Sequence, residues 1–542
     1  MNVSSTFQGA RLLTNKSTNF YRKLFVIASV LLIFVALLIR FLLIRVDMAW
    51  ISDISHSQLI SRLILHNKGS PQFGHWNSGL ESNYPPYFYH TIAFLRTVSD
   101  TYYWVLGVQA LLSLAAGLAV YKITTLIGSR KFGIFALLLY LVSPPMAEVS
   151  SSVWQPCFAV PIALLSFIAV AQACLNKRIS LFRLTLSIVV LAFSTTIAYG
   201  ATLQVLLVII LFLLFLPKIK LKLFYAPFTL IAFCIFNVQP IITNGVGNYI
   251  LMHIRALGYG KPQINPLNTY NNFNLVLHST FNEFVPVATF IFLVMALLVY
   301  LWQEKSRRKK VFITVLSIYY FASLYLSARV GQIHYGLVQY PILYILLGAS
   351  LSKFFRKGSV VLGTAGVFLI IYFTVAFFPK NLNKLFKSEV GSRNYILFND
   401  LTKSILYNVG NRSKTLFLVV ENGKDGKGYS DSTNFWYFHS YENLDAYVLE
   451  PSDTFCPVNI GGICYKDIPG NIVLVCPRID SKISKMFRNR HIEYEDCLGE
   501  YSKIAGTVGK RVDKKSQIGE INFIAVDEFK YKKMKFPIIQ GL

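Results

Sequence analysis

The sequence predicts an α-helical membrane protein with about eleven transmembrane helices, followed by a C-terminal mixed α/β domain outside the membrane. Its 542 residues are 54% hydrophobic and 15% charged, and the mean hydropathy is +0.48. These values are typical of a chain that crosses a bilayer many times. Apolar runs long enough to cross a hydrocarbon core of about 30 Å occur near residues 24–44, 101–121, 132–147, 157–175, 184–199, 201–216, 223–241, 284–302, 311–327, 337–352 and 359–378.

The basic residues predict the orientation of these helices. Lys and Arg in short loops stay on the cytoplasmic side, and every second loop is basic, counted from the N-terminal tail. With an odd number of spans, the N-terminus lies in the cytoplasm and the C-terminus outside. The net charge of +27 therefore indicates topology and affinity for anionic membrane lipids, and is weak evidence for nucleic acid. The bases are Arg11, Lys16, Arg22, Lys23, Lys122, Arg130, Lys131, Lys177, Arg178, Arg183, Lys218, Lys220, Lys222, Lys305, Arg307–Lys310, Lys353, Arg356 and Lys357.

Three regions follow from these patterns. Residues 1–23 form a cytoplasmic tail, and residues 24–378 form the transmembrane region with two long outer loops, 45–100 and 242–283. Residues 379–542 carry frequent charges of both signs and short β-rich runs, "KTLFLVV" at 414–420 and "NIVLVC" at 471–476. Outside the cytoplasm, an even number of cysteines favours disulfides over buried free thiols. The pairing among the four cysteines of this region stays open: Cys456, Cys464, Cys476 and Cys497.

Acidic side chains gather at the predicted outer face. Seven precede residue 379, and six of them lie on that side in the predicted orientation, whereas Glu304 lies inside. Two of the six, Asp47 and Asp53, come just after the first span. Asp53 stands at the start of "DISHSQLISRLILHN" (53–67), whose apolar stripe predicts an interfacial helix along the membrane surface. From position alone, Asp53 is slightly better explained as a helix-capping carboxylate than as a catalytic one.

Three further outer segments carry aromatic and polar residues. The first is "YPPYFY" (84–89), in which the two prolines favour an extended entry and Tyr84 and Tyr87 suit the headgroup zone. The second is "SPPMAEVSSSVWQPCFAVP" (143–161), which exposes Glu148 and Trp154. The third, "ARVGQIHYGLVQYP" (328–341), brings Arg329, His334 and Tyr335 near the same surface.

Together these segments resemble the GT-C membrane glycosyltransferases that use a polyprenyl-phosphate sugar, and above all glycosyltransferase family 39, which includes aminoarabinose lipid A transferases and protein O-mannosyltransferases. The family's acid, glycine and Tyr/Pro-rich element are matched by Asp53, Gly69 and residues 84–89. The resemblance covers about residues 20–378.

Two later elements of the family are also matched, one by Ser143-Pro144 with Trp154-Gln155-Pro156 and the other by His334-Tyr335 with Pro341. Ile54 and Ser151 depart from the pattern, because the family often has Glu or Gln after the acid and an Arg three residues before the Trp.

The resemblance implies transfer of a sugar from polyprenyl phosphate to an acceptor hydroxyl of a lipid, glycan or protein, in the plasma (inner) membrane. The acceptor must lose a proton, so Asp53 is the expected general base and Asp47 the second choice. A cation must stabilise the leaving phosphate, for which Arg329, Arg255 and Lys261 are candidates. The other expected substrate-binding residues are His334, Tyr335, Tyr84, Tyr87, Glu148 and Trp154.

A divalent metal stays open, with Glu81 and His253 as ligands, because the histidines show no tight ligand spacing. A lipid-linked sugar transporter or flippase is the main alternative, but transporters usually place polar residues in mid-helix. An O-antigen polymerase or ligase is a third class.

Overall fold

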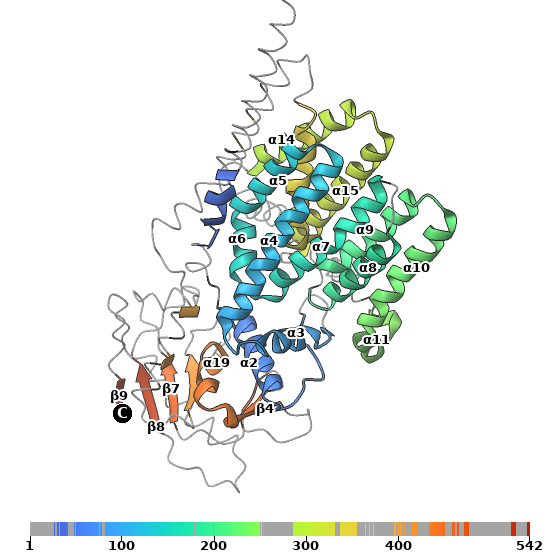
Figure 1. Cartoon of the computed structure of the whole chain (residues 1–542). Coiled ribbons are helices and arrows are strands. Elements are labelled where there is room, and N and C mark those ends of the chain that lie inside the picture. Colours follow the sequence, from blue (N-terminus) through green and yellow to red (C-terminus); the bar gives the residue numbers. More distant parts are fainter. Residues whose placement is uncertain are drawn as a thin grey trace, which may run out of the picture.

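A computed structural model gives the arrangement of the helices, and a small α/β region lies at one end of the helical bundle (Figure 1). The structure describes residues 27, 30, 31, 33–38, 40, 41, 48, 50–74, 76, 77, 82–176, 180–198, 200–249, 251, 286–330, 337–354, 364, 368, 372, 395, 396, 399, 402, 403, 406, 415–419, 433–449, 458–460, 463–465, 471–475, 522–526 and 539–541.

The predicted spans between residues 101 and 352 coincide with described helices or helix pairs. The first and last predicted spans lie mostly outside the described residues. The helices are α4 Tyr102–Ile127, α5 Arg130–Val142, α6 Pro144–Ser151, α7 Gln155–Asn176, α8 Leu181–Thr195, α9 Gly200–Phe215, α10 Ile219–Phe236, α11 Val238–Asn244, α14 Pro286–Gln303, α15 Arg307–Val330 and α16 Tyr340–Leu351.

Within the described part, four helices are long and apolar enough to cross a membrane: α4, α7, α10 and α15. The pair α5 and α6, bent by 65°, makes a fifth if it is one span. Shorter apolar helices occupy 181–195, 200–215, 290–303 and 337–351. The chain is therefore a multi-pass membrane protein, and the count of eleven spans stays a prediction.

The centre of the bundle is built on α4, which packs against α5, α7 and α16. Every residue of α16 is buried. A glycine permits this close approach, because a Cβ at Gly348 would lie 2.7 Å from the Thr124 methyl group and 2.9 Å from the Ala136 side chain. Such contacts fix the inner helices against each other at the packing density of a protein interior.

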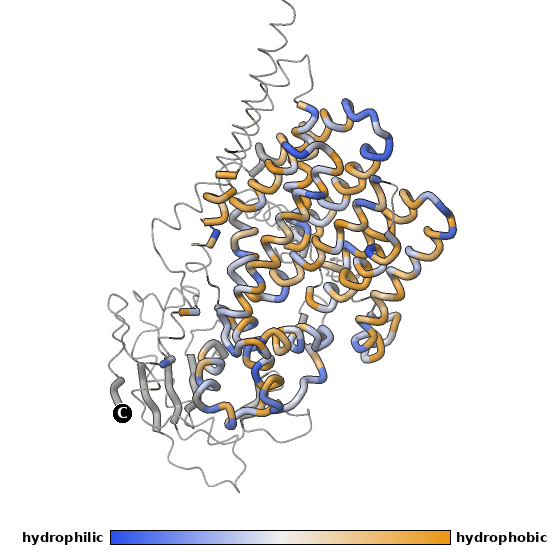
Figure 2. The backbone as a smooth tube through the Cα atoms, in the orientation of Figure 1, coloured by the Kyte–Doolittle hydropathy of each residue, from blue (hydrophilic) through white to orange (hydrophobic). Residues whose placement is uncertain are grey.

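Two bases at the start of α15 bond the C-terminal ends of three other helices. The Arg308 guanidinium donates to the carbonyl oxygen of Cys174 and, at 2.7 Å, to that of Phe215. The Lys309 ammonium donates to the carbonyl oxygen of Ile127 at 2.7 Å. These carbonyls lack partners within their own helices, so the bases contribute to packing in addition to their predicted role in topology. Figure 2 shows a hydrophilic turn between α14 and α15, at the end of the bundle away from α2 and α3.

The opposite end carries two further helices, α2 Ser52–Leu65 and α3 Tyr87–Arg96, and a short hairpin of β1 Trp76–Asn77 and β2 Ser82–Asn83. The predicted helix after Asp53 is present as α2, and its interfacial placement along a membrane surface stays a prediction. Its polar side is also buried, at Ser57, Gln58 and Ser61, because helix α19 (Thr433–Glu442) of the C-terminal region packs against α2 (Figure 1).

The C-terminal region contains two sheets. The order of the first is β3-β7-β8-β9, with three parallel strands and an antiparallel edge strand. The second, antiparallel, has the order β4-β6-β5. Both predicted strands are present, as β3 and β7, and they pair directly. The bounds are β3 Thr415–Val419, β4 Tyr447–Leu449, β5 Val458–Ile460, β6 Ile463–Tyr465, β7 Asn471–Val475, β8 Asn522–Val526 and β9 Ile539–Gly541, and a 3-10 turn, η2, spans Leu444–Ala446.

One of the four cysteines of this region, Cys464 on β6, is disulfide-bonded. The other three lie outside the described residues.

Candidate functional site

The acid after the first span and the tryptophan of the second outer segment meet in the structure. The indole Nε1–H of Trp154, between α6 and α7, donates to Asp53 Oδ2 at 3.2 Å across 101 residues of sequence. An indole N–H can only donate, so it orients the carboxylate as an acceptor. Both side chains are partly exposed.

The capping explanation of Asp53 is not supported by the geometry of α2. Ile51 occupies the N-cap position, and Asp53 stands in the first turn of the helix. A negative charge there is still favourable to the helix dipole. The carboxylate therefore interacts with the helix dipole and with the Trp154 indole from a position just beyond the N-cap.

A phenol lies close enough to Asp53 to be affected by its charge. Burial, and secondly the charge of Asp53, raise the pKa of Tyr89 on α3, so its hydroxyl stays protonated in the physiological range. The neighbouring Phe88 packs edge-on against Phe158 of α7, with ring centroids 5.8 Å apart. The segment around Trp154 is anchored further by Gln109 of α4, whose amide donates to the carbonyl oxygens on either side of it, at Val149 (2.6 Å) and Cys157 (2.9 Å).

A buried arginine, which the sequence analysis missed, lies behind this segment. Arg40 is 2% exposed and lies within the first predicted span. Its Nε donates to Ser150 Oγ at 3.0 Å, and its Nη2 to Ser113 Oγ at 3.1 Å. It also donates to main-chain oxygens of α5 and α6. An ionisable residue inside an apolar run is the signal that could have found it.

A second polar cluster joins α2 and α3. Asp100 accepts from Arg62 Nε at 2.7 Å, from Arg96 Nη1 at 2.5 Å and from His66 Nε2 at 3.2 Å. Burial raises the pKa of Asp100, but hydrogen bonds from Arg62 and His66 and the charge of Arg96 outweigh it, so the pKa lies below its ordinary value of 3.8. Because both arginines are engaged, they are poor candidates for binding a substrate phosphate.

The same two arginines hold the C-terminal region. Arg96 donates to Tyr437 Oη at 3.0 Å, and Arg62 donates to Ser440 Oγ at 3.0 Å. The Arg62 guanidinium also lies over the ring of Tyr441, 3.9 Å from its centroid, and cation–π contacts of this kind are favourable. This Asp100 cluster therefore docks α19 onto the helix that carries Asp53.

Two further contacts extend the docking surface. Lys68 pairs with Asp445 at 2.5 Å, and its carbonyl accepts from the amide of Leu449 at 2.9 Å. The next residue, Gly69, has φ +120°, and a Cβ there would lie 2.7 Å from the carbonyl oxygen of Leu449. Gly69 is thus the glycine that the close approach of β4 requires.

Aromatic packing completes the interface. Trp50, fully buried, contacts Tyr102, Tyr395, Tyr437 and Phe438, with ring centroids 5.0–5.2 Å apart. Aromatic pairs with these separations stabilise beyond their buried area. The C-terminal region and the start of α2 therefore share one hydrophobic core.

Three other predicted site residues lie in the described part. Glu148 is exposed on α6. The carbonyl of Tyr84 accepts from the amide of Gly74 at 2.7 Å, which closes the β1–β2 hairpin onto the Tyr/Pro-rich segment. Tyr87 is 37% exposed and packs edge-on against Phe236 of α10. These positions are compatible with the predicted substrate-binding face and do not establish a contact with substrate.

The remaining predicted residues have no described side chain. Arg329 belongs to α15, but only its backbone is described. Among the described residues, no three His, Cys, Asp or Glu side chains form a group that could hold a metal ion. The residues that lie outside the described part are Asp47, Glu81, His253, Arg255, Lys261, His334 and Tyr335.

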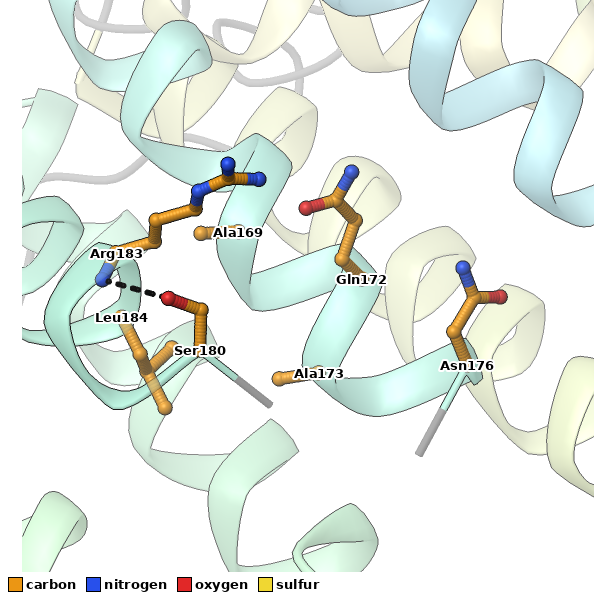
Figure 3. Close-up of a pocket in the computed structure, with 7 residues that line it drawn as sticks. All are labelled: Ala169, Gln172, Ala173, Asn176, Ser180, Arg183 and Leu184. Carbon is orange, nitrogen blue, oxygen red and sulfur yellow. Dashed lines mark hydrogen bonds between the residues drawn. The ribbon is translucent and has the colours of Figure 1, made fainter. Parts of the chain in front are cut away.

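A cavity of about 330 Å³ is lined by residues of α7 and α8 (Figure 3). It opens between the C-terminal end of α7 and the start of α8. Its polar lining residues are Gln172, Asn176, Ser180 and Arg183. Asn176 is separated from Gln155 by the whole of α7, about 30 Å at 1.5 Å per residue, so this cavity is not part of the candidate site.

Comparison with solved structures identifies the fold. A structure of ArnT from Cupriavidus metallidurans bound to undecaprenyl phosphate matches with a TM-score of 0.51 and 10% identity, over 92% of this chain and 92% of that chain. The same protein in the apo state matches with a TM-score of 0.50 and 12% identity, over 94% and 93%. The chain has the GT-C fold.

The GT-C resemblance predicted from the sequence is thus confirmed at the level of the fold. An Archaeoglobus fulgidus oligosaccharyltransferase tethered with an acceptor peptide also matches, with a TM-score of 0.43, 11% identity and 77% of this chain covered, and this chain spans 63% of that one. No family model matches the chain, and no curated protein matches its sequence.

Proposed function

We propose that this protein is an integral-membrane glycosyltransferase that moves a sugar from a polyprenyl-phosphate donor to an acceptor hydroxyl at the outer face of the membrane. The observation that carries the proposal is the Trp154–Asp53 hydrogen bond, which unites two motif residues in a GT-C fold. One of the matching structures, ArnT, holds undecaprenyl phosphate, which supports a polyprenyl-phosphate lipid as the donor class.

In this proposal Asp53 is the general base. The acceptor oxygen attacks the anomeric carbon, the bond from that carbon to the phosphate oxygen breaks, and the acceptor proton passes to the Asp53 carboxylate. General-base catalysis of this kind contributes about 10²–10⁴-fold. Trp154 keeps the carboxylate oriented, and Tyr89 supplies a protonated hydroxyl beside it. Asp47 remains the second choice for the base.

The leaving polyprenyl phosphate acquires negative charge and needs a cation. Arg62 and Arg96 are engaged by Asp100, so we retain Arg329 as the first candidate and Arg255 and Lys261 as the next. Glu148 and Tyr87 are exposed on nearby elements and are proposed to contact the acceptor or the sugar. His334, Tyr335 and Tyr84 complete the proposed binding residues.

The main alternative is a lipid-linked sugar transporter, and the two functions differ in whether a glycosidic bond is broken. The test is to purify the protein into nanodiscs with anionic lipid and add a mixed pool of polyprenyl-phosphate sugars with membrane-envelope glycans. The proposal predicts release of free polyprenyl phosphate in step with labelled acceptor. Translocation of intact lipid-linked sugar in liposomes, with no release of polyprenyl phosphate, would favour the transporter.

A further inference from the structure

We propose that Arg40 is a positioning residue for the Asp53–Trp154 pair, acting through the break between α5 and α6. The inference deepens the proposed function and rests on it for the activity measurements alone. Its structural part, that Arg40 fixes the place of the Trp154 indole, can be tested without any substrate.

The Arg40 guanidinium fills the bend between α5 and α6. Besides the two serine hydroxyls already described, Nη1 donates to the carbonyl oxygens of Tyr140 (3.2 Å) and Leu141 (3.5 Å), and Nη2 donates to that of Met146. The Tyr140 and Leu141 carbonyls are among the last of α5, which the end of a helix leaves without intrahelical partners. A cation at the C-terminal end of a helix is favourable.

The fit depends on the shape of the arginine. A guanidinium has a planar fork of N–H donors, and Arg40 directs all three of its nitrogens at oxygens of three helices, α4, α5 and α6. Its face also lies 5.0 Å from the ring centroid of Tyr140. A buried charge is costly unless it is fully hydrogen-bonded. We therefore expect that loss of the guanidinium, or of one of its acceptor oxygens, would weaken the attachment of α6 to α4 and α5.

The contacts of Arg40 indicate a positioning role and not a direct contact with substrate. Because the Arg40 nitrogens are bound to the protein, the side chain is not available to neutralise a donor phosphate. Its effect passes from Ser150, near the end of α6, through three intervening residues to Trp154. Gln109 anchors the two sides of that segment, and Arg40 anchors the helix before it.

The test uses the fluorescence of Trp154, one of six tryptophans. The emission of each protein minus that of its Trp154→Phe counterpart isolates this indole. We expect Arg40→Met to shift the difference spectrum, and Ser150→Ala, which removes one acceptor and should fold normally, to shift it in the same direction by less. Arg308→Met is the matched control, because it also removes an arginine bonded to helix carbonyls, and it should leave the spectrum unchanged.

Turnover gives the second readout. Arg40→Met and Trp154→Phe should each lower kcat about tenfold with KM for the donor lipid little changed, and the double variant should lose no more than the larger single effect. An unchanged Trp154 spectrum in both Arg40→Met and Ser150→Ala, or an equal shift in Arg308→Met, would overturn the inference. If no variant and no wild-type protein transfers sugar, the proposed function fails, whereas the spectral result still decides the role of Arg40.

Discussion

Replacement of Asp100 by Asn should loosen the C-terminal region from α2 and α3. Asp100 accepts from two arginines and a histidine, and Arg96 is completely buried. Asn keeps the shape but removes the charge, which leaves two guanidinium groups without a counterion. Breaking a buried pair from one side costs about 3–5 kcal/mol, and the lower end applies here because Asp100 is 25% exposed. At 1.4 kcal/mol per tenfold, about 3 kcal/mol corresponds to an opening equilibrium roughly 10²-fold larger.

Limited proteolysis in detergent measures this opening, because cleavage of a transiently opened state follows its population when opening and closing are fast. We expect a cut that separates the C-terminal region to appear roughly 10²-fold faster in Asp100→Asn. Asp445→Asn is the control: its pair with Lys68 is also short, but Asp445 is 95% exposed, so little should change. Equal cleavage rates in wild type and Asp100→Asn would refute the reasoning.

The remaining predictions concern pH, the basic turn and topology. Because the pKa of Asp100 is lowered in the folded protein, the stabilisation that its carboxylate provides is complete above pH 3.8 and is lost as the pH falls further. The rate of proteolytic release should therefore rise in acid for the wild type and depend less on pH in Asp100→Asn. Arg308→Gln with Lys309→Gln should lower the thermal midpoint in detergent, because three helix carbonyls lose their donors; an unchanged midpoint would restrict these bases to topology. A reporter fused after residue 400 should be active on the extracytoplasmic side, and cytoplasmic activity would mean that the spans are miscounted.

The spans were predictable because apolar length is a local property of the sequence. The runs at 101–121 and 157–175 became α4 and α7 with shifts of a few residues at most ends. The burial of α2 was not predictable in this way. Its polar side is typical of a water-facing surface until α19 is placed against it, and Ser440 of α19 lies 378 residues beyond Arg62 in the sequence.

In the candidate site, too, individual residues could be predicted from the sequence, whereas the contacts between them could not. Asp53 and Trp154 were both singled out on the family resemblance, and no local pattern indicates that they touch. Arg40 was overlooked because an arginine near the end of an apolar run is ordinarily explained by snorkelling. The carbonyl oxygens that bind the buried Arg40 guanidinium lie at the bend between α5 and α6. This bend is a tertiary feature that no local pattern of the sequence indicates.

Turnover of Asp53→Asn tests the central claim most directly. The Asn side-chain oxygen can still accept from the Trp154 indole, and Asp53 is not the N-cap of α2, so folding, membrane level and binding of donor lipid should persist. Without the proton acceptor, sugar transfer should fall by roughly 10²–10⁴-fold. Glu304→Gln is the control: this residue lies at the other end of the bundle, so correctly inserted Glu304→Gln protein should retain sugar transfer. Full transferase activity in well-expressed Asp53→Asn protein would contradict the assignment of Asp53 as the base.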